Sequence, residues 1–397
     1  MAKKKYVLLI ILIAAVIIGA VVYLLFLQDR PESLDEPAEL TLWYSQSSPL
    51  SENLEFLTEK YNTELSPRSK VTVTLCPYES EMAIMNAVSE AKENSGELPD
   101  MIMCDADVSA WLSKARLLAD TENYQRNWDT ELCDKAMMKS CTVSGKLVCM
   151  PVAAEYDVLV VNTKLYPDNE SIDSFEALCE SANAYYMENK QYFFTLTDYA
   201  AFFRTAMAQL DERFEAENPF EDEDEDVRYI YDHLATSAFK RGFTAAKGDP
   251  VRMVAEGKLV CALVPAGSVM AAAKNYDVSS LGIMPCPPMK NGDSVYVPHV
   301  TGISALKSDE NSLMGASIFI SWLLSEENNA VLTGQSGLVP AKSVETEEEV
   351  ETSALYDELM TAVSGMKSRV YHANSDYPLK SYEFNSIIDN IMKKSLS

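Results

Sequence analysis

The sequence has few histidines and none of the short motifs that mark common catalytic sites. None of its three histidines, His233, His299 and His372, is near another histidine or a cysteine. The patterns HExxH, GxSxG, GxxxxGK and GxGxxG do not occur. Zinc centres and Ser-His-Asp triads need clustered ligands or such motifs. We therefore expect no catalytic residues, no metal site and no cofactor.

Two pairs of carboxylates remain as candidate catalytic groups. Asp105 with Asp107, or Glu155 with Asp157, offers the two acidic groups that glycoside hydrolysis requires. Spacing along the sequence does not give the separation of the carboxyl groups, so an extracytoplasmic hydrolase stays open as an alternative to a binding protein.

Basic residues are scarce as well. The chain has 33 Lys and Arg against 60 Asp and Glu, a formal net charge of -27 over 397 residues. After residue 30, no cluster of basic residues interrupts this excess of negative charge. Such a body repels the phosphates of nucleic acids, so no nucleic-acid partner is expected.

The chain lacks a disulfide pattern, although it has eight cysteines. No CxxC occurs, and several cysteines lie inside apolar runs, where a free thiol behaves as a small hydrophobic group. We expect buried thiols, and Cys133 with Cys141 is the first pair to test for a disulfide.

A long apolar run is found at the start of the chain. Residues 6–27 carry no charge and follow Lys3, Lys4 and Lys5. As a helix the run measures about 33 Å, enough to cross a bilayer, and it lacks a good small-residue cleavage site. The pattern predicts a single-pass anchor or an uncleaved signal in the cell membrane. Residues 1–5 would be cytoplasmic, 28–38 a linker, and the body extracytoplasmic.

The body alternates strand and helix patterns, which predicts an α/β fold with a mainly parallel sheet. Its length suggests two domains. A predominantly helical stretch is expected over 174–252. Strands are expected over 39–44, 70–75, 100–104, 147–151, 157–162, 259–264, 282–285 and 300–305, and helices over 49–62, 81–92, 108–118, 313–324 and 355–364.

Several landmarks occur in a characteristic order over residues 39–392. They are LTLWYS at Leu40–Ser45, LPDMIMCD at Leu98–Asp105, GKLVCMPVA at Gly145–Ala153, EGKLVCAL at Glu256–Leu263 and GLVPA at Gly337–Ala341. Together they resemble the extracellular solute-binding proteins of ABC importers, family 1, the maltose-binding-protein-like group.

The resemblance implies a two-lobed periplasmic-binding-protein-like fold of type II, with hinge strands between the lobes. One lobe would combine residues 39–152 and 282–330, the other 153–281 and 331–397. The lobes would close on a small-molecule ligand, expected to be a sugar, and a monomeric body would deliver it to ABC permease subunits. Such binding needs no catalytic group.

The resemblance also implies ligand-binding residues, most of them directly after strands. They are Tyr44, Ser45, Gln46, Asp105, Asp107, Glu155, Tyr156, Gly267, Ser268, His299 and Thr301, with Tyr371 and Tyr377 as an aromatic platform before the last helix. Carboxylates and amides bind sugar hydroxyls, and an aromatic ring covers the apolar face of a pyranose.

Each candidate also has a purely structural interpretation. Tyr44 and Tyr156 fit a core, Asp105 fits a helix N-cap, and Gly267 fits a turn. The chain has only four tryptophans, fewer than sugar-binding relatives often place in the cleft. Tyrosine would replace them, or the ligand is not a sugar. A ligand-sensing module without a transport role is the alternative function.

Overall fold

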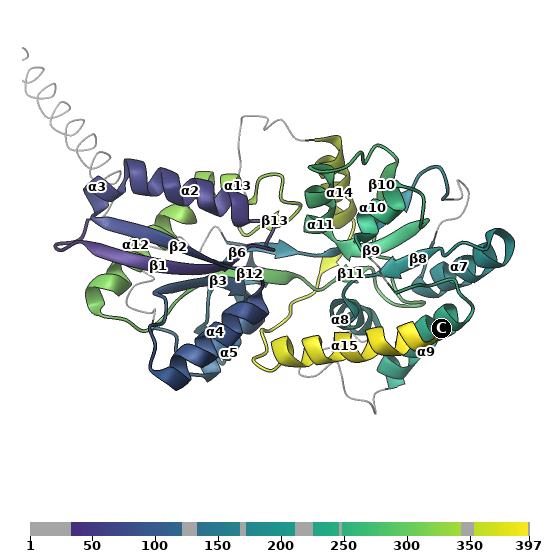
Figure 1. Cartoon of the computed structure of the whole chain (residues 1–397), viewed down its shortest axis with the longest axis horizontal. Helices are drawn as coiled ribbons and strands as arrows, with labels where there is room; N and C mark the ends of the chain where they lie inside the picture. The colour runs from purple at the N-terminus through teal and green to yellow at the C-terminus, as the bar shows by residue number, and fades with distance from the viewer. Residues whose placement is uncertain are drawn as a thin grey trace, which may run out of the picture.

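The computed structural model describes residues 33–120, 133–166, 172–210, 225–245, 248–342 and 353–395. Two α/β lobes lie side by side along its long axis (Figure 1). Within these ranges no helix is both long and apolar enough to span a bilayer. The predicted cytoplasmic end (1–5) and anchor (6–27) lie outside the described residues.

The first lobe is built on a six-stranded sheet with the order β13-β6-β12-β3-β1-β2. Its strands are β1 (Ala38–Ser45), β2 (Val71–Tyr78), β3 (Met101–Asp105), β6 (Met150–Glu155), β12 (His299–Ala305) and β13 (Val339–Pro340). Its helices are α2 (Ser51–Glu64), α3 (Ser66–Ser69), α4 (Glu81–Asn94), α5 (Ala106–Lys114), α6 (Lys135–Ser140), α12 (Glu310–Leu323) and α13 (Glu326–Thr333). A hairpin of β4 (Thr142–Val143) and β5 (Lys146–Leu147) precedes β6.

Strand β3 shows why this lobe has helices on both faces of the sheet. Successive side chains of a strand point to opposite faces. Met101 and Met103 join the core formed with α2 and α12, whereas Ile102 and Cys104 join the core formed with α4 and α5. The uninterrupted apolar run is therefore explained by burial on both faces.

The second lobe is built on a four-stranded sheet with the order β10-β7-β9-β8. Its strands are β7 (Asp157–Asn162), β8 (Phe194–Leu196), β9 (Cys261–Pro265) and β10 (Leu281–Pro285). Its helices are α7 (Phe175–Asn189), α8 (Tyr199–Leu210), α9 (Glu225–Phe239), α10 (Pro250–Ala255), α11 (Ala266–Ala273), α14 (Ala354–Ser364) and α15 (Tyr377–Ser395). Strands β11 (Val295–Tyr296) and β14 (Lys367–Ser368) pair with each other.

Strand β7 again separates two cores. Leu159 and Val161 face the core with α7, α8 and α9, while Val158 and Val160 face the core with α10, α11 and α14. Helix α15 extends from the boundary between the lobes across α8 and α9 (Figure 1). Both lobes thus have the same three-layer construction, which confirms the predicted two-lobed α/β fold.

The expectation of mainly parallel sheets is wrong. Strands pair in parallel only in β2-β1-β3 and in β8-β9, and all other pairs of the two large sheets are antiparallel. The cause is the connection between the lobes. The chain leaves the first lobe through β6 and returns through β12, so these neighbouring strands run in opposite directions.

The predicted first segment of the first lobe ends at residue 152, but strand β6 continues to Glu155 in the sheet of that lobe. The lobe boundaries also differ from the predicted division at two later places. Strand β10 begins at Leu281 and pairs with β7, so residues 281–285 belong to the sheet of the second lobe. Strand β13 pairs with β6, and α13 packs on α2, so this segment belongs to the first lobe. The chain therefore crosses to the first lobe later than residue 282, and it returns to the second lobe later than residue 331.

All eight cysteines lie in the described ranges, and no disulfide joins any two of them, including Cys133 and Cys141. Seven are buried and Cys76 is half-buried, as expected for thiols inside apolar strands and helices. Trp43, Trp111 and Trp322 pack against the cores of the first lobe. Trp128 lies outside the described residues.

Candidate functional site

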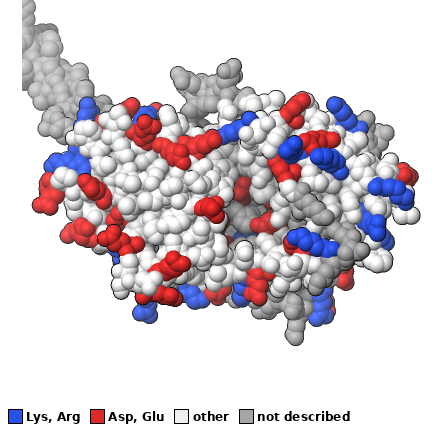
Figure 2. Space-filling view, viewed as in Figure 1, with Lys and Arg blue, Asp and Glu red and all other residues white. Residues whose placement is uncertain are grey.

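Two adjoining cavities lie between the lobes, and we call them together the interlobe cleft. The first measures about 220 Å³ and the second about 190 Å³. Glu81, Asp105, Asp198 and His299 line both. Acidic side chains border the hollow between the two halves in Figure 2.

The cleft collects the ends of strands from both sheets. Serines 45, 47 and 48 follow β1, and Asp105 and Glu155 end β3 and β6. In the antiparallel pairing, His299 of β12 lies opposite Glu155, and Thr301 lies opposite Asp105. From the second lobe come Asp157, at the start of β7, and Asp198, between β8 and α8.

Asp105 is the N-cap of α5, as its structural interpretation predicted. Its Oδ1 accepts a hydrogen bond of 2.7 Å from the backbone nitrogen of Asp107. The carboxylate of Glu81 accepts a hydrogen bond of 2.7 Å from the backbone nitrogen of Asp105. Burial and the nearby Asp105 charge raise the pKa of Glu81, so these acidic groups compete for a limited supply of hydrogen-bond donors.

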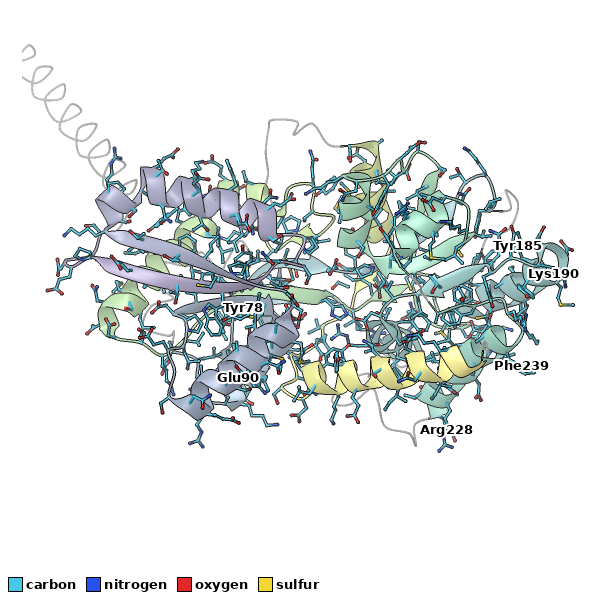
Figure 3. All side chains as sticks on the ribbon, in the orientation of Figure 1. Tyr78, Glu90, Tyr185, Lys190, Arg228 and Phe239 are labelled. Atoms are coloured by element: carbon cyan, nitrogen blue, oxygen red, sulfur yellow. The ribbon has the colours of Figure 1, made fainter. Side chains whose placement is uncertain are left out.

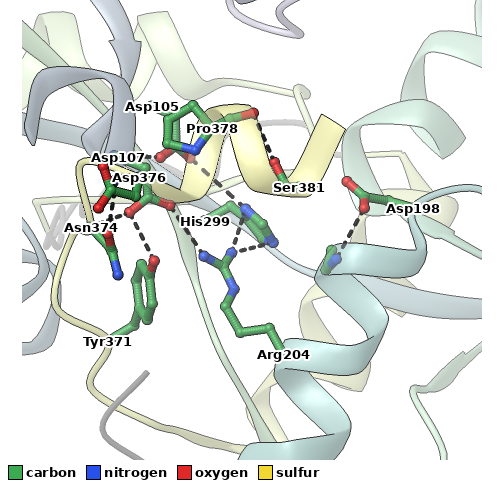
Figure 4. Close-up of polar contacts among 11 residues, drawn as sticks. Asp105, Asp107, Asp198, Arg204, His299, Tyr371, Asn374, Asp376, Pro378 and Ser381 are labelled. Carbon is green, nitrogen blue, oxygen red and sulfur yellow. Dashed lines mark hydrogen bonds and ion pairs between the residues drawn. The ribbon is translucent and has the colours of Figure 1, made fainter. Parts of the chain in front are cut away.

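Arg204 of α8 is the cation at the lobe boundary (Figure 4). It donates to Asp107 Oδ2 at 3.3 Å and contacts the ring of His299. Its guanidinium carbon lies 4.3 Å from the centre of the Tyr371 ring and 4.4 Å from that of Tyr377. Burial alone would lower the pKa of Arg204, but the tyrosines and Asp107 raise it, so the group is charged.

Both carboxylate oxygens of Asp107, the partner of Arg204, accept hydrogen bonds. Tyr371 donates its hydroxyl proton to Asp107 Oδ1 at 2.9 Å, and the backbone nitrogen of Asn374 donates to the same oxygen at 2.6 Å. Side chains of Arg204 and Asp107 are 1% and 3% exposed. This buried ion pair joins the two lobes, and breaking it would leave a charge unpaired.

His299 is neutral. Burial and the charge of Arg204 lower the pKa of its imidazole well below the usual value. The nearest oxygen of Asp105 is 3.9 Å from His299 Nδ1, and because the ring is uncharged this contact is not an ion pair. The imidazole therefore adds no positive charge to the cleft.

Glu155 and Asp157 flank Tyr156, the residue at which the chain passes from the first lobe to the second. Glu155 Oε1 accepts a hydrogen bond of 3.1 Å from the backbone nitrogen of Gly267. Burial raises the pKa of Glu155 to about 7, with further increases from Asp105 and Asp198. Burial likewise raises the pKa of Asp157 to about 7, and no group of the described chain donates a hydrogen bond to its carboxylate.

Gly267 allows the lobes to approach closely. A Cβ atom at this position would lie 2.4 Å from Pro49 Cγ of the first lobe and 2.6 Å from Glu155 Oε1. Two exposed ion pairs also link the lobes at the rim. Lys114 pairs with Asp376 at 2.6 Å, and Lys274 pairs with Glu52.

The predicted ligand residues separate into two groups. Those that line the cleft are Ser45, Asp105, Asp107, Glu155, Tyr156, His299, Thr301 and Tyr377. Those that line neither cavity are Tyr44, Gln46, Gly267, Ser268 and Tyr371. Tyr44 and Tyr156 belong to the cores, and the rings of Tyr371 and Tyr377 both pack against Arg204. Tyr377 is the first residue of α15 and not part of a preceding segment.

Four functional candidates were absent from the predicted site: Glu81, Asp157, Asp198 and Arg204. Glu81 begins the helix after β2, so the rule that selected other strand ends applies to it as well. Asp157 was considered only as half of a catalytic pair. Asp198 and Arg204 follow the three-residue strand β8. This strand was not predicted, because it lies within the stretch that was expected to be helical.

No group of three or more His, Cys, Asp or Glu side chains in the described residues is arranged to hold a metal ion. The carboxylates of the cleft are spread along its walls and do not converge on one point.

A family model described as bacterial extracellular solute-binding protein matches residues 57–357. A search of curated proteins found no match. Many solved structures share the fold, among them three that are described as binding proteins or receptors or by their bound ligand. Maltose-bound T. maritima MalE3 is 15% identical with a TM-score of 0.73, covering 90% of this chain and 95% of that one.

The GacH receptor of Streptomyces glaucescens, studied with acarbose, is 16% identical with a TM-score of 0.72, covering 91% of this chain and 94% of that one. An ABC transporter solute-binding protein from Agrobacterium radiobacter K84 in complex with ribitol is 15% identical with a TM-score of 0.71, covering 91% and 95%. At these identities the similarity establishes the fold.

Proposed function

Because the chain belongs to the family of bacterial extracellular solute-binding proteins, we propose that it captures a small polar solute, expected to be a carbohydrate, and delivers it to an ABC importer. The family consists of binding proteins and not enzymes, and its members act outside the cytoplasm. Proteins of similar structure were solved with maltose, acarbose and ribitol, which supports a polyhydroxylated ligand.

The observation that carries the proposal is the composition of the interlobe cleft. Both lobes contribute polar side chains to one small cavity, including Asp105 and Glu155 from the first lobe and Asp157 and Asp198 from the second. A ligand that touches both walls stabilises the closed arrangement of the lobes. Ser45, Thr301 and the carboxylates can bind hydroxyl groups.

We further propose that residues 6–27 hold the protein in the cell membrane, with the body presented to permease subunits outside. The support is the uncharged run after three lysines. Comparison of the mass of the mature membrane-bound protein with that of the full translation product tests this anchor. A mature protein about 20 residues shorter would refute it.

Thermal unfolding of the full chain across sugars, polyols, amino acids and amines tests the binding function. A ligand that binds only the folded state raises the unfolding temperature in proportion to the logarithm of its concentration. We expect such a rise with at least one small polar solute. Absence of a rise with every class, together with no small molecule in the native mass spectrum of the purified protein, would refute the proposed function.

A further inference from the structure

The cleft carries an unusual charge for a site that would bind a neutral solute. Among the described residues that line the first cavity, the ionisable ones are five carboxylates, one histidine and one tyrosine, and none is lysine or arginine. The carboxylates are those of Glu81, Asp105, Glu155, Asp157 and Asp198. The histidine is neutral.

Arg204 does not neutralise these carboxylates. Its ion pair is made with Asp107, which lines only the second cavity, and its guanidinium packs against the rings of Tyr371 and Tyr377. Arg204 does lower the pKa of Asp105 and of Asp157, but burial raises both and outweighs it. The negative charge of the first cavity therefore has no cation of its own among the lining residues.

Two carboxylates retain free capacity to accept hydrogen bonds. No described group donates to Asp157, and Gly267 N donates to one oxygen of Glu155. A neutral hydroxyl can donate a hydrogen bond to them but leaves their mutual repulsion in place. A protonated amine supplies up to three donors and also removes the repulsion.

A metal ion fits the cavity less well than an organic cation. The carboxylates of the described cleft do not form a ligand cluster. The space of about 220 Å³ in the first cavity is below the usual range for drug-sized ligands, roughly 300–1,000 Å³, and suits a molecule of about one sugar ring or a short alkyl chain.

We infer that the solute is a cation that places a protonated amine between Glu155 and Asp157, close to Asp198. This inference rests on the proposed function and specifies the charge of its ligand. An amino sugar and an aliphatic diamine share the required chemistry, and the test separates them.

The experiment compares cations with neutral molecules of similar shape. Calorimetric titration of the full chain at pH 7 uses glucosamine against glucose, and putrescine against 1,4-butanediol, with maltose as a larger neutral sugar. We expect one cation to bind about ten- to hundredfold more tightly than its neutral partner, the range for a hydrogen bond to a charged group. Preference for glucosamine identifies an amino sugar, and preference for putrescine a diamine.

Two variants connect the effect to the cleft. Asp157→Asn and Glu155→Gln keep the size of each side chain and remove one charge, and each should lower the affinity for the cation about tenfold or more. Asp232→Asn and Glu90→Gln are the matched controls, because both residues are exposed on outer helices. Glu90 lies on α4, away from the lobe boundary (Figure 3). The controls should not change the affinity.

Two results would overturn the inference. If glucose or maltose binds as tightly as any cation, the solute is a neutral sugar, and the proposed function stands while the charge assignment fails. If neither cation binds, the charge assignment fails whatever the neutral molecules do, and the proposed function is then decided by the thermal unfolding series and the native mass spectrum. Equal losses in the cleft variants and in the controls would also refute the location of the amine.

Discussion

The interlobe cleft and a groove on the second lobe are both concave, but different residue types build them. The groove measures about 430 Å³ and lies between α9 and α15. Its lining is mostly apolar and comes from the second lobe: Phe203, Val227, Arg228, Tyr231, Lys380, Glu383, Phe384, Ile387, Ile388 and Ile391. Arg228 marks its outer side, away from the boundary between the lobes (Figure 3).

The comparison of the cleft with the groove shows that volume alone does not identify the binding site. The first cavity of the cleft is about half as large as the groove, yet both lobes line it, and its carboxylates have raised pKa values. Perturbed acidic groups in a concave site are a mark of function. A solute in the groove would contact one lobe only and would not favour closure of the two.

The largest effect is expected from Gly267→Ala, which should weaken ligand binding in the cleft and leave the groove unchanged. The new methyl group would meet Pro49 of the opposite lobe and the carboxylate of Glu155. Overpacking of this kind costs about 1–3 kcal/mol, so affinity for the cleft ligand should fall about ten- to hundredfold. Calorimetric titration measures the loss.

The matched control is Gly365→Ala at the end of α14. A Cβ atom there would meet its nearest neighbour, the carbonyl oxygen of Ala362, at 3.7 Å, an ordinary contact. Its affinity should equal that of the unmodified protein. Unchanged affinity in Gly267→Ala would show that the solute does not require the close approach of the lobes.

The next largest effect is a pH dependence confined to ligands of the cleft. Glu155 and Asp157 have pKa values of about 7, and a cation binds their ionised forms. Affinity for putrescine should therefore fall as the pH drops through 7. A single group predicts a loss of about tenfold between pH 8 and pH 6. The charged groups that face these carboxyls are Asp105, Asp198 and Arg204.

Titration calorimetry at several pH values measures this change. Putrescine is suitable because its amines remain protonated throughout, as ordinary alkylamines have pKa values of about 10. An apolar ligand of the groove should show no such dependence. Constant putrescine affinity from pH 6 to pH 8 would mean that these carboxyls do not bind the amine.

A smaller effect is expected on the stability of the ligand-free protein. In the folded state the pKa of Asp157 is raised, so the folded protein binds more protons than the unfolded chain between about pH 4 and pH 7. Its contribution therefore lowers the unfolding free energy as the pH rises through this window. Asp157→Asn should remove the penalty and raise the unfolding free energy at pH 7.5 by about 1.4 kcal/mol for each unit by which the pKa is raised.

Urea denaturation of the ligand-free protein at pH 5 and pH 7.5 measures this gain. The gain should be present at pH 7.5 and much smaller at pH 5, because Asp157 is protonated there. Asp232→Asn, on the exposed side of α9, should change neither value. A loss of stability in Asp157→Asn at both pH values would indicate that the carboxylate is needed for folding.

The smallest effect is expected in the groove. Ile387 is 49% exposed on α15, and Ile387→Ser makes the groove more polar without removing a buried core residue. Solute affinity should remain within about twofold of the original value, because surface substitutions rarely exceed 0.5 kcal/mol. A larger loss would show that the groove takes part in binding.

Much of the fold was predictable because burial on two faces leaves a strong pattern. The apolar runs of β3 and β7 predicted strands between helices, and the order of landmarks predicted two lobes. The prediction of a mainly parallel sheet was wrong, because the pattern of one strand does not show in which direction the neighbouring strand runs. The direction depends on the path of the chain between lobes, as in β6 and β12.

The candidate site was predictable in part for a similar reason. Side chains that follow predicted strands, such as Asp105 and Glu155, do lie at the cleft. Asp198 and Arg204 escaped notice because β8 is only three residues long and sits within a helical stretch. The role of Tyr371 and Tyr377 also escaped notice, since the contact of Arg204 with their rings depends on long-range packing.

The most direct test of the account is a crystal structure of the protein grown with putrescine or glucosamine, whichever binds more tightly. We expect electron density for this cation in the interlobe cleft, with an amine nitrogen within hydrogen-bond distance of Glu155 or Asp157 and with contacts to both lobes. Density for the cation in the groove near Tyr231 and Phe384, with an empty cleft, would contradict it.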